Sequence, residues 1–148
     1  MLNLGIIYAE HQRPDLAEPM LEGLYSRNPN SAPTAYNYGE LLARTGQWAL
    51  AEPIMLRALE LDPRNDRWWM EFSNIEFTLG KVVEAQAAAG EAVRLKPEAP
   101  GYHAVLGVLA MKLGDRGTAE KEFREELKRH PDNQAARSGL KELGSLNN

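Results

Sequence analysis

The sequence predicts an all-α solenoid, a linear stack of repeated helix–turn–helix units, and two observations lead to this prediction. The first is the equal spacing of four prolines, Pro29, Pro63, Pro97 and Pro131, and we call this spacing the repeat step. The second is a helical period of apolar residues within each interval. Self-similarity at a fixed step of about 20–50 residues is typical of solenoids, because each unit is one small motif that stacks on the next.

Two columns of small residues keep the repeat step and support the prediction. One column is Ala17, Ala51, Ala85 and Ala119, and the other is Gly5, Gly39, Ser73 and Gly107. If each unit ends two residues beyond its proline, the chain divides into units 1–31, 32–65, 66–99 and 100–133, with 134–148 left over. The sequence therefore predicts four repeats followed by a short C-terminal segment.

The second unit shows how each repeat divides into two helices. Ala35, Tyr38 and Leu42 recur at i, i+3 and i+7, which places them on one face of a helix. Gly46 then suits the left-handed residue that follows a helix end. The second helix stops before Pro63, since the residue that precedes a proline is disfavoured in the α region. Glycine recurs at the Gly46 position in the later units, as Gly80 and Gly114.

Composition excludes several classes of function. A length of 148 residues suits one domain, and a formal net charge of −4 gives no general basic field for nucleic acid or an anionic membrane. The absence of cysteine excludes disulfides, thiol nucleophiles and thiolate metal sites. The longest uncharged run, Ala99–Met111, is shorter than the roughly 20 residues that span a bilayer. We therefore expect no nucleic-acid partner and no membrane insertion. Because no signal-peptide pattern is present, we expect a cytoplasmic location.

Pairs such as Tyr38-Gly39 and Leu106-Gly107, each followed by the repeated alanine and closed by the proline, resemble the tetratricopeptide repeat (TPR) family. The resemblance implies a right-handed superhelical solenoid with a C-terminal capping helix. It also implies that the first helices line a concave groove, that the second helices form the convex back, and that a protein or peptide binds in the groove. Glu76 departs from the pattern because Leu42 holds the same slot in the second unit, and we expect packing there to shift to Ile75 and Phe77.

The resemblance also implies which residues face the groove. They are Leu2, Ile6, Tyr36, Asn37, Glu40, Arg44, Arg67, Met70, Glu71, Asn74, Phe77, Val105, Val108, Met111 and Lys112. Chaperone-binding members hold a terminal carboxylate with Asn and Arg, but here Glu40 and Glu71 occupy those slots, so that clamp is not reproduced. The apolar members predict anchors for an extended peptide or an amphipathic helix, with charges on the rim. The alternative is that some of these side chains pack between neighbouring first helices.

The two ends of the array differ. Asp132 or Asn133 can cap a terminal helix whose apolar stripe includes Ala136 and Leu140, and residues 144–148 should fray. The N-terminal end carries no such cap. Either the chain is a segment of a longer array, or this end pairs with another molecule and forms a homo-oligomer.

No arrangement of residues predicts catalysis, a metal or a cofactor. His11, His103 and His130 occupy different slots without metal-ligand spacing, and we interpret them as surface or helix-end residues. Three acids at 122, 125 and 126 alternate with basic residues and predict a solvated helix face. We therefore predict a non-enzymatic interaction scaffold that needs no cofactor. The alternatives are a self-assembling structural element and a scaffold segment of a larger multidomain protein or enzyme.

Overall fold

A computed structural model describes residues 13–144 of the chain, and these residues form α-helices and no strand. The helices are α2 (Pro14–Arg27), α3 (Ala32–Arg44), α4 (Trp48–Leu61), α5 (Asp66–Thr78), α6 (Val82–Leu95), α7 (Tyr102–Lys112), α8 (Arg116–Arg129) and α9 (Gln134–Glu142). The all-α prediction is confirmed.

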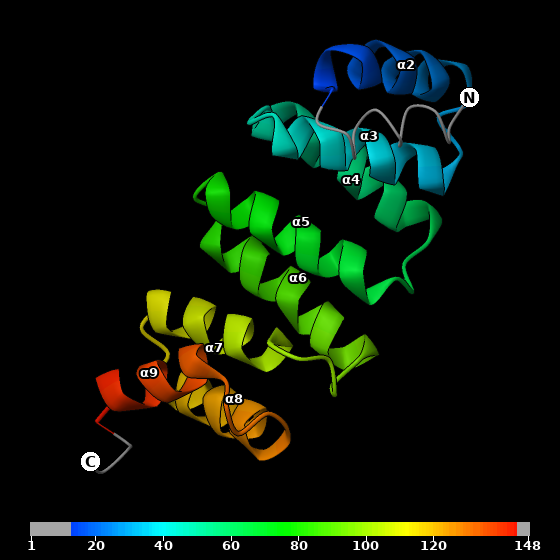
Figure 1. The fold of residues 1–148 in the computed structure, drawn as a ribbon. Helices are drawn as coiled ribbons and strands as arrows, with labels where there is room; N and C mark the ends of the chain where they lie inside the picture. Colours follow the sequence, from blue (N-terminus) through cyan, green and yellow to red (C-terminus); the bar gives the residue numbers. More distant parts are fainter. Residues whose placement is uncertain (1–12, 145–148) are drawn as a thin grey trace.

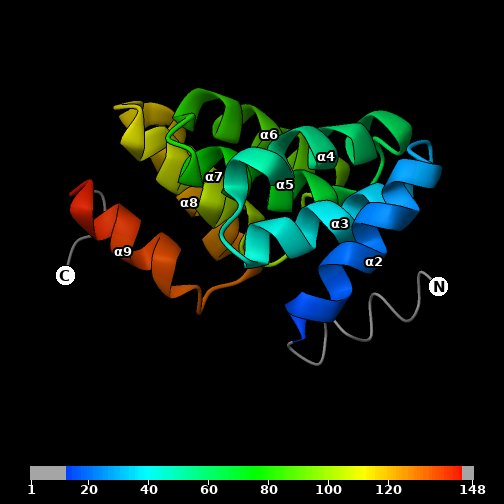
Figure 2. The same cartoon turned by 90° about the horizontal axis from the view of Figure 1, so that it is seen from above.

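The helices pack in chain order as a row of hairpins (Figure 1). The closest packing joins α3 to α4, α5 to α6 and α7 to α8, and each hairpin also contacts the next one. Helices α2 and α9 lie at opposite ends of the row, as Figures 1 and 2 both show. A row in which each unit packs on its neighbours is the mark of a solenoid, so the predicted superhelical stack is confirmed.

The turns within the hairpins contain the glycines that the sequence pattern singled out. Gly46, Gly80 and Gly114 have φ values of 81°, 80° and 77°. A side chain is strained in this left-handed region, so glycine closes the first helix of each hairpin at little cost. Side-chain caps begin several helices: Ser31 accepts a hydrogen bond from the Thr34 amide, Asn65 from Trp68, Asp115 from Thr118 and Asn133 from Ala136. Asn133 is thus the cap of the last helix.

Small residues lie where helices approach each other closely. The repeated alanines Ala17, Ala51, Ala85 and Ala119 are all 0% exposed. At Gly39 of α3, an added Cβ would lie 3.2 Å from the backbone nitrogen of Met55 in α4. The small columns therefore set the distance between the helices of each hairpin.

A polar bridge between second helices recurs at the repeat step. The Gln47 side-chain amide donates to the Glu18 carboxylate at 3.1 Å. One unit later, the Lys81 ammonium pairs with Glu52 at 2.6 Å. The copied spacing thus sets polar contacts between units as well as apolar ones.

Glu76 of α5 is a buried carboxyl group in a position where an apolar residue would fit. It is 2% exposed, its Oε2 atom has no hydrogen-bond partner in the described part of the chain, and the Lys81 ammonium lies 3.9 Å from that atom. Burial is the main cause that raises its pKa, the Glu52 charge raises it further, and Lys81 opposes both. Ile75 is buried as predicted, but Phe77 is 39% exposed, so the prediction that Phe77 packs in the core is wrong. Phe77 instead faces the surface described below.

Replacement of Glu76 by glutamine is expected to stabilise the protein at neutral pH. The pKa of Glu76 in the folded state is above its ordinary value of 4.5. Above pH 4.5 the folded state therefore keeps the proton on Glu76 more often than the unfolded state does. The wild-type protein therefore loses stability with rising pH, whereas glutamine stays neutral. Urea unfolding at pH 7 should show a gain of about 1 kcal/mol for Glu76→Gln, and the gain should shrink as pH falls towards 4.5. Glu142→Gln, an exposed change at the end of α9, is the control, and a lower urea midpoint for Glu76→Gln at pH 7 would contradict the prediction.

Candidate functional site: the inner surface of the arc

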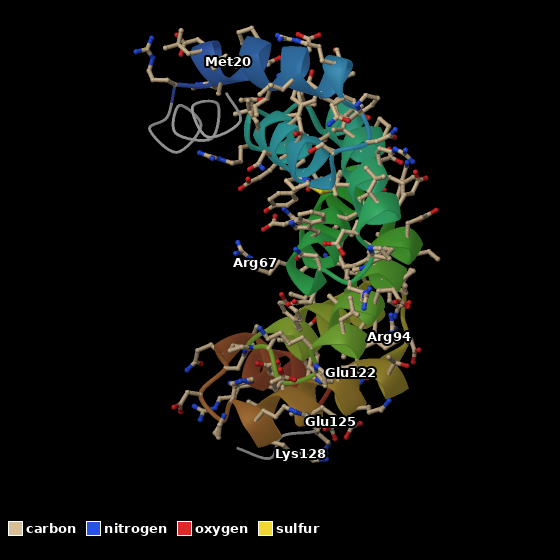
Figure 3. All side chains as sticks on the ribbon, turned by 90° about the vertical axis from the view of Figure 1, so that its right-hand side faces the viewer. Met20, Arg67, Arg94, Glu122, Glu125 and Lys128 are labelled. Carbon is tan, nitrogen blue, oxygen red and sulfur yellow. The ribbon has the colours of Figure 1, made fainter. Side chains whose placement is uncertain are left out.

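The described part of the predicted groove lies on the first helices, α3, α5 and α7, and none of its residues is fully buried. Figure 3 shows the row bent into an arc, with Arg67 of α5 pointing to the inner side and Arg94 of α6 on the outer side. Leu2 and Ile6 lie outside the described residues, as does the N-terminal end for which pairing with another molecule is an alternative.

Among the hollows that the described residues form on this surface, the C-terminal pocket is a space of about 550 Å³ between α5, α7 and the start of α9. It is lined by Met70, Glu71, Ser73, Asn74, Phe77, Gly101, Ala104, Val105, Val108, Leu109, Asn133 and Ala135. Six of these belong to the predicted groove: Met70, Glu71, Asn74, Phe77, Val105 and Val108. Glu71 is the one ionisable side chain among the described residues that line it. The pocket is thus mainly apolar, with a carboxylate on one wall.

A second hollow, the central pocket, adjoins the first and has a volume of about 250 Å³. It is lined by Glu40, Ala43, Arg44, Trp48, Met55, Glu71, Asn74 and Ile75. Glu71 and Asn74 line both hollows, so the two pockets meet along α5. Of the predicted residues that the structure describes, five line neither hollow: Tyr36, Asn37, Arg67, Met111 and Lys112.

Some of the predicted residues serve packing, which was the alternative interpretation. Tyr36 stacks on Trp68 of the next first helix, with ring centroids 4.7 Å apart and planes tilted by 11°. Met111 packs against the buried cluster around Phe123. The Asn37 amide donates to the Pro33 carbonyl at 2.6 Å and so bonds within its own helix.

The charge of Glu40 acts on Glu71, the second carboxylate of the inner surface. Burial is the first cause that raises the pKa of Glu71, the Glu40 charge is the second, and the Arg67 guanidinium opposes both. The same groups act on Tyr36, where burial and then the charges of Glu40 and Glu71 raise the pKa to about 12. Within residues 13–144, neither Glu40 nor Glu71 forms an ion pair within 4.0 Å.

The sequence reasoning missed the pocket residues that come from the last helix. Asn133 and Ala135 line the C-terminal pocket, whereas the resemblance places the groove on the first helices of the four units. One signal could have found them. Ala135 follows Gly101 by one repeat step, and both line the same pocket, so the register of the repeat continues into α9.

The prediction of a solvated face on α8 is wrong for two of its three acids. Glu122 is 6% exposed, and its Oε2 atom lies 2.6 Å from Nδ1 of His103, which is itself buried at 6% exposure. Glu126 is 0% exposed and accepts hydrogen bonds from the Gly101 amide at 2.8 Å and the Asn133 side chain at 3.0 Å. These acids are buried because polar partners from α7 and the start of α9 reach them, which the charge pattern along α8 does not show.

Glu125 behaves as the sequence predicts for a solvated helix. Its carboxylate pairs with Lys128 and Arg129 one turn further along α8. Hydrogen bonds from these two cations lower its pKa to about 2. His103 lies at a helix end, as predicted, but is not a surface residue.

Two searches for other kinds of site concern residues 13–144 only. No group of three or more histidine, aspartate or glutamate side chains there is placed to hold a metal ion. In the same range, no helix combines the length and apolar character needed to cross a bilayer.

Stacked hairpins with a hollowed inner surface define a helical-repeat solenoid. A family model described as tetratricopeptide repeat matches residues 8–71, and a second one with the same description matches residues 41–102 and 104–140. The chain therefore belongs to the tetratricopeptide repeat family. Members of this family are in general protein-interaction scaffolds without catalytic activity, and they bind proteins or peptides.

Solved structures share the fold. A crystal structure of MamA superposes with a TM-score of 0.87 at 16% identity and covers 97% of this chain and 81% of that one. MamA from Desulfovibrio magneticus RS-1, from position 41 to its end, has a TM-score of 0.81 at 22% identity and covers 90% and 75%. YrrB, described as a TPR protein with an unusual peptide-binding site, has a TM-score of 0.84 at 21% identity and covers 93% and 71%. No curated protein matches the sequence. At these identities the likeness shows the fold alone.

Proposed function

We propose that this chain is a non-enzymatic scaffold that binds an extended peptide or an amphipathic helix along the inner surface of the arc. The observation that carries the proposal is the C-terminal pocket, a mainly apolar space of about 550 Å³. Phe77, Val105 and Val108 line it and are 39%, 39% and 38% exposed. Large apolar side chains that stay in contact with water around one hollow are typical of a partner-binding surface.

The arrangement suits a ligand that runs along the row of helices. The central pocket and the C-terminal pocket meet at Glu71 and Asn74, so a segment bound in one reaches directly into the other. The peptide-binding site named for YrrB, which shares the fold, supports a peptide as the class of ligand. Apolar side chains of the ligand would fill the C-terminal pocket, and polar ones would face the charged rim.

We also propose that the scaffold consists of units 1–31, 32–65, 66–99 and 100–133, with α9 as the cap. Support comes from the two faces of α9. Ala136, Gly139 and Leu140 are buried, whereas Gln134, Arg137 and Lys141 are exposed. A terminal helix with a polar outer face closes a solenoid to further stacking. Residues 145–148, for which fraying is expected, lie outside the described residues.

The triple variant Phe77→Glu, Val105→Glu and Val108→Glu is expected to lose partner capture, because these side chains line the C-terminal pocket and three carboxylates would have to be buried against an apolar ligand. The measurement is a pull-down from native lysate, with circular dichroism to show that helical content is retained. The matched control places the same charges on exposed apolar residues of the second helices, Leu50→Glu, Leu56→Glu and Val83→Glu, and should still capture the partner. Undiminished capture by the first variant and loss in the control would move the site to the outer face.

A further inference from the structure

The wall between the two pockets is acidic. Glu71 of α5 lines both hollows, and Glu40 of α3 lines the central one. The two charges are close enough for the Glu40 carboxylate to raise the pKa of Glu71. In residues 13–144, neither group has an ion-pair partner or hydrogen-bond partner. The free protein therefore keeps two like charges side by side at the point where a ligand would cross from one pocket to the other.

Binding of a ligand raises the free energy of these two carboxylates unless the ligand supplies a positive charge. A peptide that fills the C-terminal pocket removes water from the Glu71 carboxylate, the one ionisable group among the described residues of that pocket. Desolvation of an unpaired carboxylate opposes binding, whereas a cation placed against it offsets that cost. The second carboxylate, Glu40, adds to the attraction because it is already near.

An aromatic pair lies beside the two carboxylates. Tyr36 stacks on Trp68 at 4.7 Å, and the pKa of Tyr36 responds to the charges of both Glu40 and Glu71. The face of an aromatic ring attracts a lysine or arginine side chain. The two carboxylates, with this aromatic pair next to them, match a cationic group better than an apolar or acidic one.

Three basic residues share this surface and oppose such a ligand. Arg44 lines the central pocket, Lys112 lies at the end of α7, and Arg67 opposes the rise in the pKa of Glu71. Within residues 13–144, Arg67 forms no ion pair within 4.0 Å with Glu40 or Glu71. Arg67 projects from α5 into the open side of the arc (Figure 3).

We infer that the segment bound in this groove places a lysine or arginine against Glu40 and Glu71, next to the large apolar side chain that fills the C-terminal pocket. The inference rests on the proposed function, which requires only a peptide and apolar anchors. It adds the chemistry of the partner, a basic amphipathic segment. It also reverses the preference for a terminal carboxylate that chaperone-binding relatives would have.

Three synthetic peptides test the inference. They share the same leucine positions and carry lysine, glutamine or glutamate at the polar positions, and their binding to the full chain is measured by fluorescence anisotropy. The lysine peptide should bind about tenfold more tightly than the glutamine peptide, and the glutamate peptide should bind most weakly. In the double variant Glu40→Gln and Glu71→Gln, the lysine peptide should weaken about tenfold and the glutamine peptide should be unchanged.

A matched control separates this site from the net negative charge of the chain. The double variant Glu60→Gln and Glu91→Gln removes the same charge from α4 and α6, and it should bind the lysine peptide as the wild type does. A charge reversal, Glu40→Lys with Glu71→Lys, should make the glutamate peptide the preferred ligand. Tighter binding of the glutamate peptide by this variant cannot result from misfolding.

Failure of the inference and failure of the proposed function give different results. If Val108→Glu abolishes binding of all three peptides but the Glu40→Gln and Glu71→Gln variant binds the lysine peptide normally, the groove is the site and the cation inference is wrong. Equal weakening by the Glu60→Gln and Glu91→Gln control would also overturn the inference. If Val108→Glu binds all three peptides as tightly as the wild type, the groove is not the site and both proposals are wrong.

Discussion

Replacing Phe123 with alanine is expected to lower the free energy of unfolding by about 3–5 kcal/mol. Phe123 is 0% exposed and belongs to α8, and its ring fills the space between two glycines of the neighbouring helices. A Cβ added at Gly107 of α7 would lie 2.7 Å from the ring, and one added at Gly139 of α9 would lie 2.3 Å from it. Truncation would leave a cavity that joins three helices, and urea unfolding followed by circular dichroism measures its cost.

Phe77→Ala is the matched control for this prediction, since it removes the same side chain from an exposed position. Phe77 is 39% exposed and lines the C-terminal pocket. Its loss should lower stability by less than about 1 kcal/mol and should weaken peptide binding. Equal loss of stability in the two variants would show that the ring of Phe123 is not the packing centre of this end.

The second large effect is expected where a small residue separates two helices. Gly39→Leu and Ala85→Leu should each lower the free energy of unfolding by about 1–3 kcal/mol, because a larger side chain forces the helices of a hairpin apart. A Cβ added at Gly39 would lie 3.2 Å from the backbone nitrogen of Met55, and Ala85 is 0% exposed. Thermal unfolding measures both. Glu40→Ala, next to Gly39 but on the inner surface, should change stability by less than about 0.5 kcal/mol, and equal melting temperatures for the three variants would contradict the repeat frame.

The fold could be predicted from the sequence because its signals are local and copied. A glycine at a helix end, such as Gly46, ends the helix through its own backbone conformation. It can therefore be recognised without knowledge of the rest of the fold. The polar bridge from Gln47 to Glu18 is repeated as Lys81 to Glu52, since a constant register carries every neighbour along with it. A fixed step along the chain therefore becomes a fixed step in space.

The buried acids could not be predicted, because their partners lie on other helices. Glu126 meets the Gly101 amide 25 residues earlier in the chain, and Glu122 meets His103 19 residues earlier. In the sequence, the same acids alternate with lysines and arginines like those of an exposed helix. The pattern of charges along one helix carries no information on its contacts with other helices. Those contacts decide whether an acid is buried.

The candidate site was predictable in outline and not in detail. Slots of the repeat place Met70, Phe77, Val105 and Val108 on one surface, and the structure brings them into one pocket. The resemblance gives no sign that Tyr36 would stack on Trp68 instead of lining that pocket, because stacking depends on the angle between successive hairpins. Packing angles follow from side-chain volumes across the interface, which a single unit of the repeat does not show.

The carboxylate of Glu126 links the C-terminal pocket to the start of the last helix. By accepting from both the Gly101 amide and the Asn133 side chain, it ties together two residues that line the C-terminal pocket. Opening of the last helix would therefore break the pocket, and a molecule seated in the pocket would oppose that opening. Amide hydrogen exchange along residues 134–142 should slow when the scaffold is occupied, so the terminal helix would signal occupancy without contacting most of the ligand.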